Sequence, residues 1–323
     1  MRFRTGVAVV ALAGVGVVAA GVWGVSSLLG GVTPFFQPDQ CTAEVNGHEV
    51  TLSVEQAENA ALITAVAVGR GLPAHAATIA LATAFQESKL YNVGAGDRDS
   101  AGLFQQRPSQ GWGTKAQVTD PYYATNAFYD ALVKVDGYET MPVTEAAQAV
   151  QRSGFPDAYA DHEADARVLA SALSGNSRHA FSCRLGGAPD AASTRLTSSG
   201  LTHRADVVRR EVDEVFGDPP MGGFAPGGVS TGHMSGSAHY DGRAVDVFVR
   251  PVSPANKVRG WAIAQYLVAM ADRLDVQTVI FDDRIWTAGS RSGDGWREYD
   301  PPESAGDRAI LEHRDHVHVD VYP

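Results

Sequence analysis

Side chains that bind metal ions are gathered near the end of the chain, in the segment LEHRDHVHVDVYP. Alternate side chains of an extended strand point to the same face. His316, His318 and Asp320 would therefore share one face with Tyr322, while the apolar residues between them face the other way: Val317, Val319 and Val321. Imidazoles and carboxylates on one face are suited to binding zinc. The alternative for this pattern is a half-exposed edge strand that binds nothing.

A second segment, SAHYDGRAVDV, has the spacing S-x-H-x-x-G-x-A-x-D. Its His239 and Asp246, taken with His318, give two imidazoles and one carboxylate. Three protein ligands and an open position for water are typical of catalytic zinc, whereas structural zinc has four protein ligands. Bound zinc lowers the pKa of its water and polarises a carbonyl, and a nearby carboxylate must then accept the proton from that water.

These two segments together resemble the zinc metallopeptidases of the D-alanyl-D-alanine carboxypeptidase type. That group also holds the vancomycin-resistance D,D-dipeptidases and the hedgehog signalling domain. The resemblance covers about residues 202–322. It implies that Zn²⁺ is the cofactor and that His239, Asp246 and His318 are its ligands.

The resemblance leaves the proton acceptor open between two carboxylates. Asp315 lies three residues before His318, as in the dipeptidase branch, and Glu312 lies six residues before it, as in the hedgehog branch. We expect Asp315 to be the base and keep Glu312 as the alternative. His316 would support the ligands or donate a hydrogen bond in the transition state.

Two further features of this half are open. The family often positions its substrate with an arginine, which here would be Arg204, Arg209 or Arg243. The glycine- and proline-rich segment 218–237 contains His233 and is either a lid over the site or an ordinary loop, and we expect an ordinary loop.

In the first half of the chain, one carboxylate ends an otherwise apolar helix. Glu87 closes the segment IALATAFQES, where a carboxylate could face a cleft and stay partly desolvated. Desolvation raises a carboxyl pKa, and a carboxylic acid that is protonated near neutral pH can donate to a leaving glycosidic oxygen. A solvated glutamate at a helix end is the alternative.

The surroundings of Glu87 resemble the lysozyme-like fold of soluble lytic transglycosylases and goose-type lysozymes. The resemblance covers about residues 53–173 and rests on ATAFQESKL followed by SAGLFQQRPSQGWGT. Glu87 and Ser88 close a helix, and a Gly-Leu-x-Gln turn ending at Gln105 comes next. The resemblance implies that Glu87 is the catalytic acid and base, and that Gln105 and Ser88 bind the sugar.

A second carboxylate near Glu87 would decide the reaction. Hydrolysis usually uses two carboxylates, and Asp97 or Asp99 is the candidate here. A lytic transglycosylase of this type needs only one, because a muramyl hydroxyl of the substrate attacks internally. Of the aromatic residues that could stack on sugar faces, we expect one or two to do so: Phe104, Trp112, Tyr122, Tyr123 and Tyr159.

These groups must be positioned by two differently built halves. Residues 38–184 show helical periodicity almost throughout, beginning with Ser53 and Gln56 at capping-box spacing. Residues 185–200 are rich in small and turn residues and are typical of a linker. Residues 201–323 alternate helices with short strands. The expected fold is a mainly-α lysozyme-like domain followed by an α+β zinc-peptidase-like domain with a small antiparallel sheet.

Residues 1–37 are expected to place both domains outside the cytoplasm. Arg2 and Arg4 precede an uncharged apolar segment, residues 6–36, which exceeds the about 20 residues that cross a bilayer. Arginines before the segment and none behind it predict a cytoplasmic N-terminus. We expect a single-pass membrane anchor, and a cleaved signal peptide with a secreted protein is the alternative.

The sequence has two cysteines, Cys41 and Cys183, which bracket the first domain. In an oxidising compartment they are expected to form a disulfide that ties the ends of that domain together. Two free thiols are the alternative.

Net charge and the two resemblances indicate the substrate. With 26 Lys+Arg against 37 Asp+Glu, the chain carries a net charge of −11, which argues against nucleic acid as a partner. One half resembles enzymes that cut the glycan strands of peptidoglycan, and the other resembles enzymes that cut its stem peptides. We therefore expect a membrane-tethered peptidoglycan hydrolase. The alternatives are a non-catalytic peptidoglycan-binding scaffold, and a zinc domain that is only a structural or signalling module.

Overall fold

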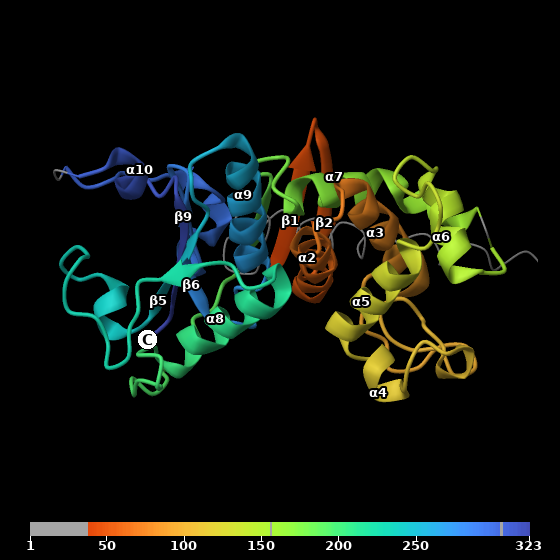
Figure 1. Ribbon diagram of the computed structural model, residues 1–323, viewed down its shortest axis with the longest axis horizontal. Coiled ribbons are helices and arrows are strands. Elements are labelled where there is room, and N and C mark those ends of the chain that lie inside the picture. The colour runs from red at the N-terminus through yellow and green to blue at the C-terminus, as the bar shows by residue number, and fades with distance from the viewer. Residues whose placement is uncertain (1–37, 156, 304–305) are drawn as a thin grey trace, which may run out of the picture. The chain divides into compact units, whose positions relative to one another are not determined.

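The computed structural model, shown in Figure 1, describes residues 38–155, 157–303 and 306–323. Residues 39–323 form one compact unit with a two-domain-like division into a mainly helical part and a part built on a larger sheet. The expected membrane segment lies outside the described residues. Within the described ranges, no helix combines the length and the apolar character needed to cross a bilayer.

Helices dominate the first part, as expected. The capping box that was predicted at Ser53 and Gln56 is present, because the Ser53 hydroxyl accepts from the Gln56 backbone and the Gln56 side chain accepts from the Ser53 backbone. The helices are α2 (Val54–Gly69), α3 (Ala74–Ser88), α4 (Lys115–Val118), α5 (Pro121–Leu132), α6 (Val143–Gln151) and α7 (Glu163–Leu173), with the short 3₁₀ turns η1 (Pro108–Gln110) and η2 (Ala158–His162).

This part also carries a three-stranded antiparallel sheet that the sequence analysis missed. The strands β1 (Gln40–Val45), β2 (His48–Leu52) and β3 (Phe181–Arg184) lie in the order β2-β1-β3. The expectation of an almost wholly helical half was wrong here. Asn46 and Gly47 join β1 to β2 with φ angles of 53° and 78°, and Asn-Gly between alternating residues is a strong hairpin signal.

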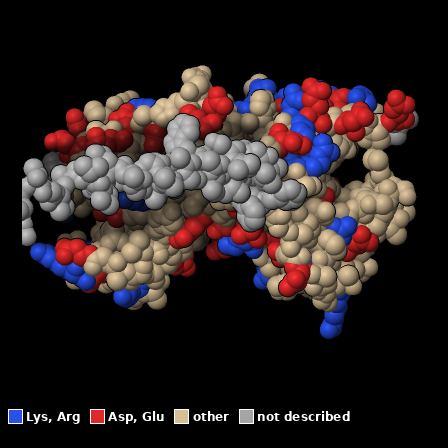
Figure 2. All heavy atoms as spheres, turned by 180° about the vertical axis from the view of Figure 1, so that it is seen from behind, with Lys and Arg blue, Asp and Glu red and all other residues tan. Residues whose placement is uncertain are grey.

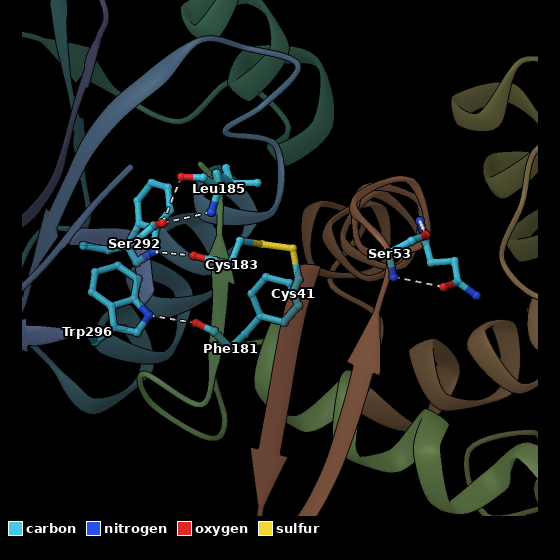
Figure 3. Close-up of a disulfide and its surroundings, with 9 residues drawn as sticks. Cys41, Ser53, Phe181, Cys183, Leu185, Ser292 and Trp296 are labelled. Carbon is cyan, nitrogen blue, oxygen red and sulfur yellow. Dashed lines mark hydrogen bonds between the residues drawn. A yellow bond between two sulfur atoms is a disulfide. The ribbon is translucent and has the colours of Figure 1, made fainter. Parts of the chain in front are cut away.

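The disulfide between Cys41 and Cys183 is confirmed, and Figure 3 shows it linking β1 to β3. The two cysteines are directly opposite each other in the antiparallel pairing. They are separated by 142 residues in the sequence. In the chain-entropy model, a disulfide that closes a loop of this size stabilises the folded protein by about 5 kcal/mol, because it removes conformational entropy from the unfolded chain. The bond therefore holds both ends of the helical part together.

The outer edge of β3 is covered by side chains from the second part of the chain. The indole N–H groups of Trp286 and Trp296 donate to the backbone carbonyls of Cys183 and Phe181, at 3.1 and 2.8 Å. The Ser292 hydroxyl hydrogen-bonds to both backbone groups of Leu185, and Figure 3 shows these contacts beside the disulfide. The carbonyls of a strand edge are thereby satisfied without a further strand.

The second part is built around a six-stranded antiparallel sheet in the order β4-β5-β9-β6-β7-β8. The strand β9 (His316–Val321) pairs with β5 on one side and β6 on the other, so it is an interior strand rather than a half-exposed edge. The other strands are β4 (Met221–Gly222), β5 (Ala244–Phe248), β6 (Val276–Phe281), β7 (Arg284–Thr287) and β8 (Arg297–Glu298).

Helices cover the apolar face of this sheet. The valines of β9 are buried in the core with residues of α8 (His203–Phe216) and α9 (Pro254–Ala269), which lie alongside the strands in Figure 1. The opposite face of β9 carries His316, His318 and Asp320, which confirms the predicted alternation. The remaining helical turns are η3 (Ala238–Asp241), η4 (Gly289–Asp294) and α10 (Arg308–Leu311).

The predicted linker, residues 185–200, contains no helix or strand apart from one isolated bridge at Leu196. It is tied down at its start, where the Gly186 N–H donates to the Asp39 carboxylate at 2.8 Å. Most of its side chains are exposed.

On the face of the molecule shown in Figure 2, acidic and basic side chains are interspersed.

Candidate functional site

Three side chains from separate elements bring their ligand atoms together on the polar face of the larger sheet. His239 lies in η3, Asp246 lies in β5, and His318 lies directly opposite Asp246 in β9. His239 Nε2 is 3.2 Å from His318 Nδ1 and 3.2 Å from Asp246 Oδ1. The third side of the triangle, from His318 Nδ1 to Asp246 Oδ1, is 3.1 Å. All three residues are buried, and they are called the ligand triad below.

The size of this triangle fits a small tetrahedral cation. Zinc binds imidazole nitrogen and carboxylate oxygen at about 2.0–2.1 Å, so two ligand atoms on a tetrahedral zinc are about 3.3 Å apart. The three observed separations, 3.1 to 3.2 Å, lie close to that value. Two imidazoles with one carboxylate are also a ligand set that zinc takes. The structure therefore contains a His-His-Asp site of the composition and size that suit a divalent metal ion.

Neighbouring groups fix the direction in which each imidazole points. His239 Nδ1 donates to the Gly223 carbonyl at 2.8 Å, which leaves Nε2 free to face the other ligands. His318 Nε2 lies 3.4 Å from the Asp320 carboxylate, which leaves Nδ1 for the centre. Metal-binding histidines usually have such a partner on the second nitrogen. Asp320 was expected on this face of the strand, but no motif in the sequence indicates its contact with His318.

Gly223 is a position where only glycine fits. Its φ angle is +79°, and a Cβ atom placed there would lie 2.3 Å from His239 Cε1 and 3.0 Å from Asp246 Oδ2. The loop backbone can thus approach the ligand triad closely enough to accept the His239 hydrogen bond. The glycine-rich loop is therefore part of the support of the site.

The ligand triad is electrostatically coupled. Burial alone would raise the pKa of Asp246, but its hydrogen bonds with His239 and His318 outweigh burial and hold the pKa well below its usual range. Burial lowers the pKa of His318, but Asp246 and Asp320 outweigh it and raise the pKa to about 9. Without a metal, His318 therefore holds a proton among the ligand atoms, and a cation that binds there must release it.

Asp315 reaches the centre through His316. One Asp315 oxygen lies 2.7 Å from His316 Nδ1, and the other accepts from Arg250 Nε at 2.6 Å. His316 Nε2 is left facing the ligand triad, 3.8 Å from Asp246 Oδ1. Both Asp315 oxygens are engaged, so the nitrogen of His316 is the better placed proton carrier of the two.

Glu312, the alternative base, is paired with two arginines. Its carboxylate lies 2.5 Å from Arg308 and 2.8 Å from Arg314, both measured to the nearest guanidinium nitrogen. These ion pairs are links to neighbouring residues in the chain. The geometry thus gives no specific support to Glu312 as the base.

The arginines that were considered for substrate have partners elsewhere in the domain. Arg204 is bound to Asp275, Arg209 to Asp206, and Arg243 to the Val321 carbonyl: the respective distances are 2.6, 3.0 and 2.8 Å. Arg250, which the sequence analysis did not consider, lies beside Asp315 with a half-exposed side chain. Its guanidinium also lies over the Phe248 ring, 4.1 Å from the centroid.

His313 is a further histidine beside the ligand triad, and it was not predicted from the sequence. Its ring centroid lies 4.6 Å from that of His316 and 5.6 Å from that of His318. Its buried Nδ1 has no hydrogen-bond partner among the described residues. Burial, followed by the charges of His318 and His316, lowers the pKa of His313 to about 3, so its ring is neutral near pH 7. The sequence feature that could have indicated this role is the position of His313 in LEHRDHVH, five residues before His318.

His233 belongs to the same cluster. The ligand atoms of His233, His239 and Asp246 all lie within 4.8 Å of one another. The His233 ring is stacked on the His239 ring, with 3.9 Å between centroids and 20° between planes. The segment that was expected to be an ordinary loop therefore brings an imidazole to the ligand triad.

A second candidate site lies around Glu87, in the last turn of α3. Burial raises the pKa of the Glu87 carboxyl above its usual range, against the opposing effect of a hydrogen bond from Tyr159. The Tyr159 hydroxyl donates to Glu87 Oε1 at 2.9 Å, and the tyrosine ring is fully buried. Glu87 is only partly buried. This combination is what a general acid near neutral pH requires.

Ser88 and Gln105 are used within the protein. The Ser88 hydroxyl donates to the Leu103 carbonyl at 2.7 Å and so ties the end of α3 to the Gly-Leu-x-Gln turn. The Gln105 amide nitrogen donates to the Gly102 carbonyl at 3.0 Å, and its oxygen accepts from Ser100 at 2.9 Å. The two residues shape the loop beside Glu87, and their contact with a sugar stays a prediction.

Asp97 and Asp99 differ in their surroundings. Asp99 accepts from the Ser109 backbone, Arg107 and the Ser109 hydroxyl at 2.7, 2.9 and 3.0 Å, and these bonds hold its pKa well below the usual range. Asp97 is almost fully exposed. Among the described residues, neither carboxylate makes a hydrogen bond or ion pair with Glu87.

The aromatic candidates for sugar stacking separate by burial. Phe104 and Tyr159 have no exposed surface, so neither ring can receive a sugar in this conformation. Trp112, Tyr122 and Tyr123 are partly exposed and keep that role as a prediction.

One protein-family model matches part of the chain. It is described as "VldE, C-terminal domain" and matches residues 197–309, about a third of the sequence. The matched segment includes His239 and Asp246 and ends before His318. The chain is similar to this family over that segment. No curated protein matches the chain.

Proposed function

We propose that the protein is a peptidoglycan hydrolase with two active sites, one that cuts stem peptides with zinc and one that cuts glycan strands with Glu87. The observation that carries the proposal is the ligand triad, in which three elements bring two imidazoles and a carboxylate within 3.1 to 3.2 Å of one another. Each imidazole is also oriented by a partner on its other nitrogen. This degree of support is expected of a metal site and exceeds what chance surface histidines would show.

Zinc would act as a Lewis acid and would lower the pKa of a water molecule bound to it. The protein supplies the proton carrier, because His316 Nε2 faces the ligand triad while Asp315 holds the other ring nitrogen. Asp315 is in turn fixed by Arg250. This series of contacts keeps the imidazole in one orientation, so that His316 can accept a proton at Nε2 and return it to the leaving amine.

Arg250 is the arginine best placed to bind an anionic group of the stem peptide. Only its Nε is used by Asp315, and half of the side chain is exposed. The guanidinium also presents a planar set of donors, which suits a carboxylate. This assignment replaces the three arginines that were considered from the sequence.

In the helical part, Glu87 would protonate the glycosidic oxygen and later act as a base. Its raised pKa keeps more of the carboxyl protonated near neutral pH. The hydrogen bond from Tyr159 fixes the carboxyl orientation. A transglycosylase-type reaction needs Glu87 alone, whereas hydrolysis would use Asp99 as the second carboxylate, which Arg107 and Ser109 keep ionised.

The proposed location is the outer face of a cell membrane, with residues 1–37 as a single-pass anchor and Zn²⁺ as the cofactor. The disulfide supports an oxidising, extracytoplasmic compartment. Peptidoglycan is the proposed substrate of both sites. A non-catalytic scaffold and a purely structural zinc domain are the competing functions.

Mass spectrometry of muropeptides tests the proposal. Purified cell walls are digested with the zinc-loaded wild type, Glu87→Gln and His239→Ala. We expect shortened or uncrosslinked stems in the first two digests, and new glycan ends in the wild type and His239→Ala. Anhydro-muramyl ends would support transglycosylation, and reducing ends would support hydrolysis. Three identical digests would reject the enzymatic function in favour of a scaffold, and bound zinc with intact stems would favour the structural module.

A further inference from the structure

His233 is turned inward from an otherwise exposed stretch of the glycine-rich loop between β4 and η3. It is half-buried, whereas its neighbours on both sides are exposed, including Met234 with 57% of its surface accessible. The inward side chain stacks on His239, a member of the ligand triad. The loop therefore directs one metal-binding side chain at the site and leaves the surrounding ones in solvent.

The backbone of His233 is held in place by Tyr240. The Tyr240 hydroxyl accepts a hydrogen bond from the His233 N–H at 3.0 Å and donates a short one to the His233 carbonyl. Tyr240 directly follows His239 in η3, so one side chain ties the loop to the segment that carries a ligand. Gly232 and Gly236, on either side of His233, have φ angles of +93° and +80°, a conformation that favours glycine, and open space around their Cβ positions.

We propose that His233 is a fourth, displaceable ligand of the cation held by the ligand triad. This inference rests on the metal site of the proposed function. The ligand atoms of His233, His239 and Asp246 lie within 4.8 Å of one another, so the His233 nitrogen is at most about 1.5 Å beyond the about 3.3 Å spacing on a tetrahedral zinc. Rotation of the imidazole about its side-chain torsions can cover that distance.

Binding of His233 would leave the centre without an open position. Four protein ligands fill a tetrahedral zinc site, whereas catalysis needs one position open for water and substrate. With His233 bound, the site is inactive, and release of His233 restores the open three-ligand form. A substrate that displaces the loop would therefore open the site as it binds.

The direct test replaces His233 by cysteine and loads the protein with Co²⁺. A thiolate bound to Co²⁺ gives an intense charge-transfer band in the near ultraviolet, which an unbound thiol does not give. The two natural cysteines are joined to each other, so the introduced thiol is free of competition. Met234→Cys is the matched control, because it places a thiol on the exposed neighbouring position. We expect the band in His233→Cys and none in Met234→Cys.

Absence of the band in His233→Cys, when its visible spectrum shows bound Co²⁺, would overturn the proposal. A zinc titration gives a second readout. We expect His233→Ala to weaken zinc binding by roughly 10- to 100-fold, and His239→Ala to abolish it. Equal zinc affinities of His233→Ala and the wild type would also overturn the fourth ligand while leaving the metal site intact. A wild type that binds neither ion would reject the metal site itself.

Discussion

Replacing Gly223 by alanine tests how closely the loop backbone must approach the ligand triad. The added Cβ would lie 2.3 Å from His239 Cε1 and 2.5 Å from His239 Nδ1, whereas ordinary contact begins at 3.4 Å. The imidazole would have to retreat by about 1 Å, the difference between those distances. That movement breaks the 2.8 Å hydrogen bond from His239 Nδ1 to the Gly223 carbonyl. Loss of such an orienting partner typically weakens metal binding by about 10- to 100-fold, or about 1.4 to 2.8 kcal/mol.

Gly227→Ala is the matched control for this substitution. Gly227 has a similar φ angle, +85°, but a Cβ there would meet nothing within 4 Å. Both substitutions should cost about 1–2 kcal/mol of stability, because each forces a side chain into a left-handed conformation. We expect thermal unfolding of the metal-free protein to show this loss in both variants, and a larger one in Gly223→Ala because its Cβ also meets His239. A competition titration with a chromophoric chelator should show weaker zinc binding only for Gly223→Ala, and equal affinities in the two variants would refute the reasoning.

Three further predictions concern the stability of the fold and the pH dependence of glycan cleavage. Burial raises the pKa of Glu58 from 4.5 to about 7, so folding favours its protonated form and stability falls as pH rises from about 4.5 to about 7. Glu58→Gln should be neutral at about pH 4 and stabilising at about pH 8 by about 1–2 kcal/mol, after allowance for partial exposure. Denaturant unfolding at both pH values checks this. Replacing Cys41 and Cys183 by serine should lower the free energy of unfolding by about 3–5 kcal/mol, and a loss below about 1 kcal/mol would contradict the role given to the disulfide. Tyr159→Phe removes a hydrogen bond that lowers the pKa of Glu87, so the pH optimum of glycan cleavage should move upward, and an unchanged pH profile would show that the bond has no such effect.

Local signals in the sequence predicted much of the secondary structure. The capping box at Ser53 and Gln56 and the alternation around His318 depend on neighbouring residues, and both are present in the structure. The hairpin at Asn46 and Gly47 was equally local, and it was missed because helical periodicity dominates the residues after Ser53. The pairing of β3 with β1 depends on residues 142 apart in sequence, which no local pattern reports.

Residues of the candidate site that belong to a sequence motif could be predicted. Residues that reach the site only because the chain folds there could not. The three residues of the ligand triad were predicted from their spacing and from the family resemblance, and the structure brings them together. The roles of Gly223 and Arg250 depend on loop and strand ends that meet only in the folded chain. The role of Asp315 as the base was expected from its spacing from His318 and stays a prediction, whereas its contacts with His316 and Arg250 could not be read from the sequence.

The measurement that tests the central claim most directly is an isothermal titration of the metal-free protein with zinc, compared with the same titration of His318→Ala. We predict one tightly bound zinc per wild-type chain, with release of a proton to the buffer because His318 must be deprotonated before it can bind the ion. The variant loses one of three ligands, so its zinc affinity should fall by at least the about 10- to 100-fold that loss of a supporting partner costs. A wild type that takes up no zinc, or a variant that binds it as tightly, would contradict the claim that these three side chains form a metal centre.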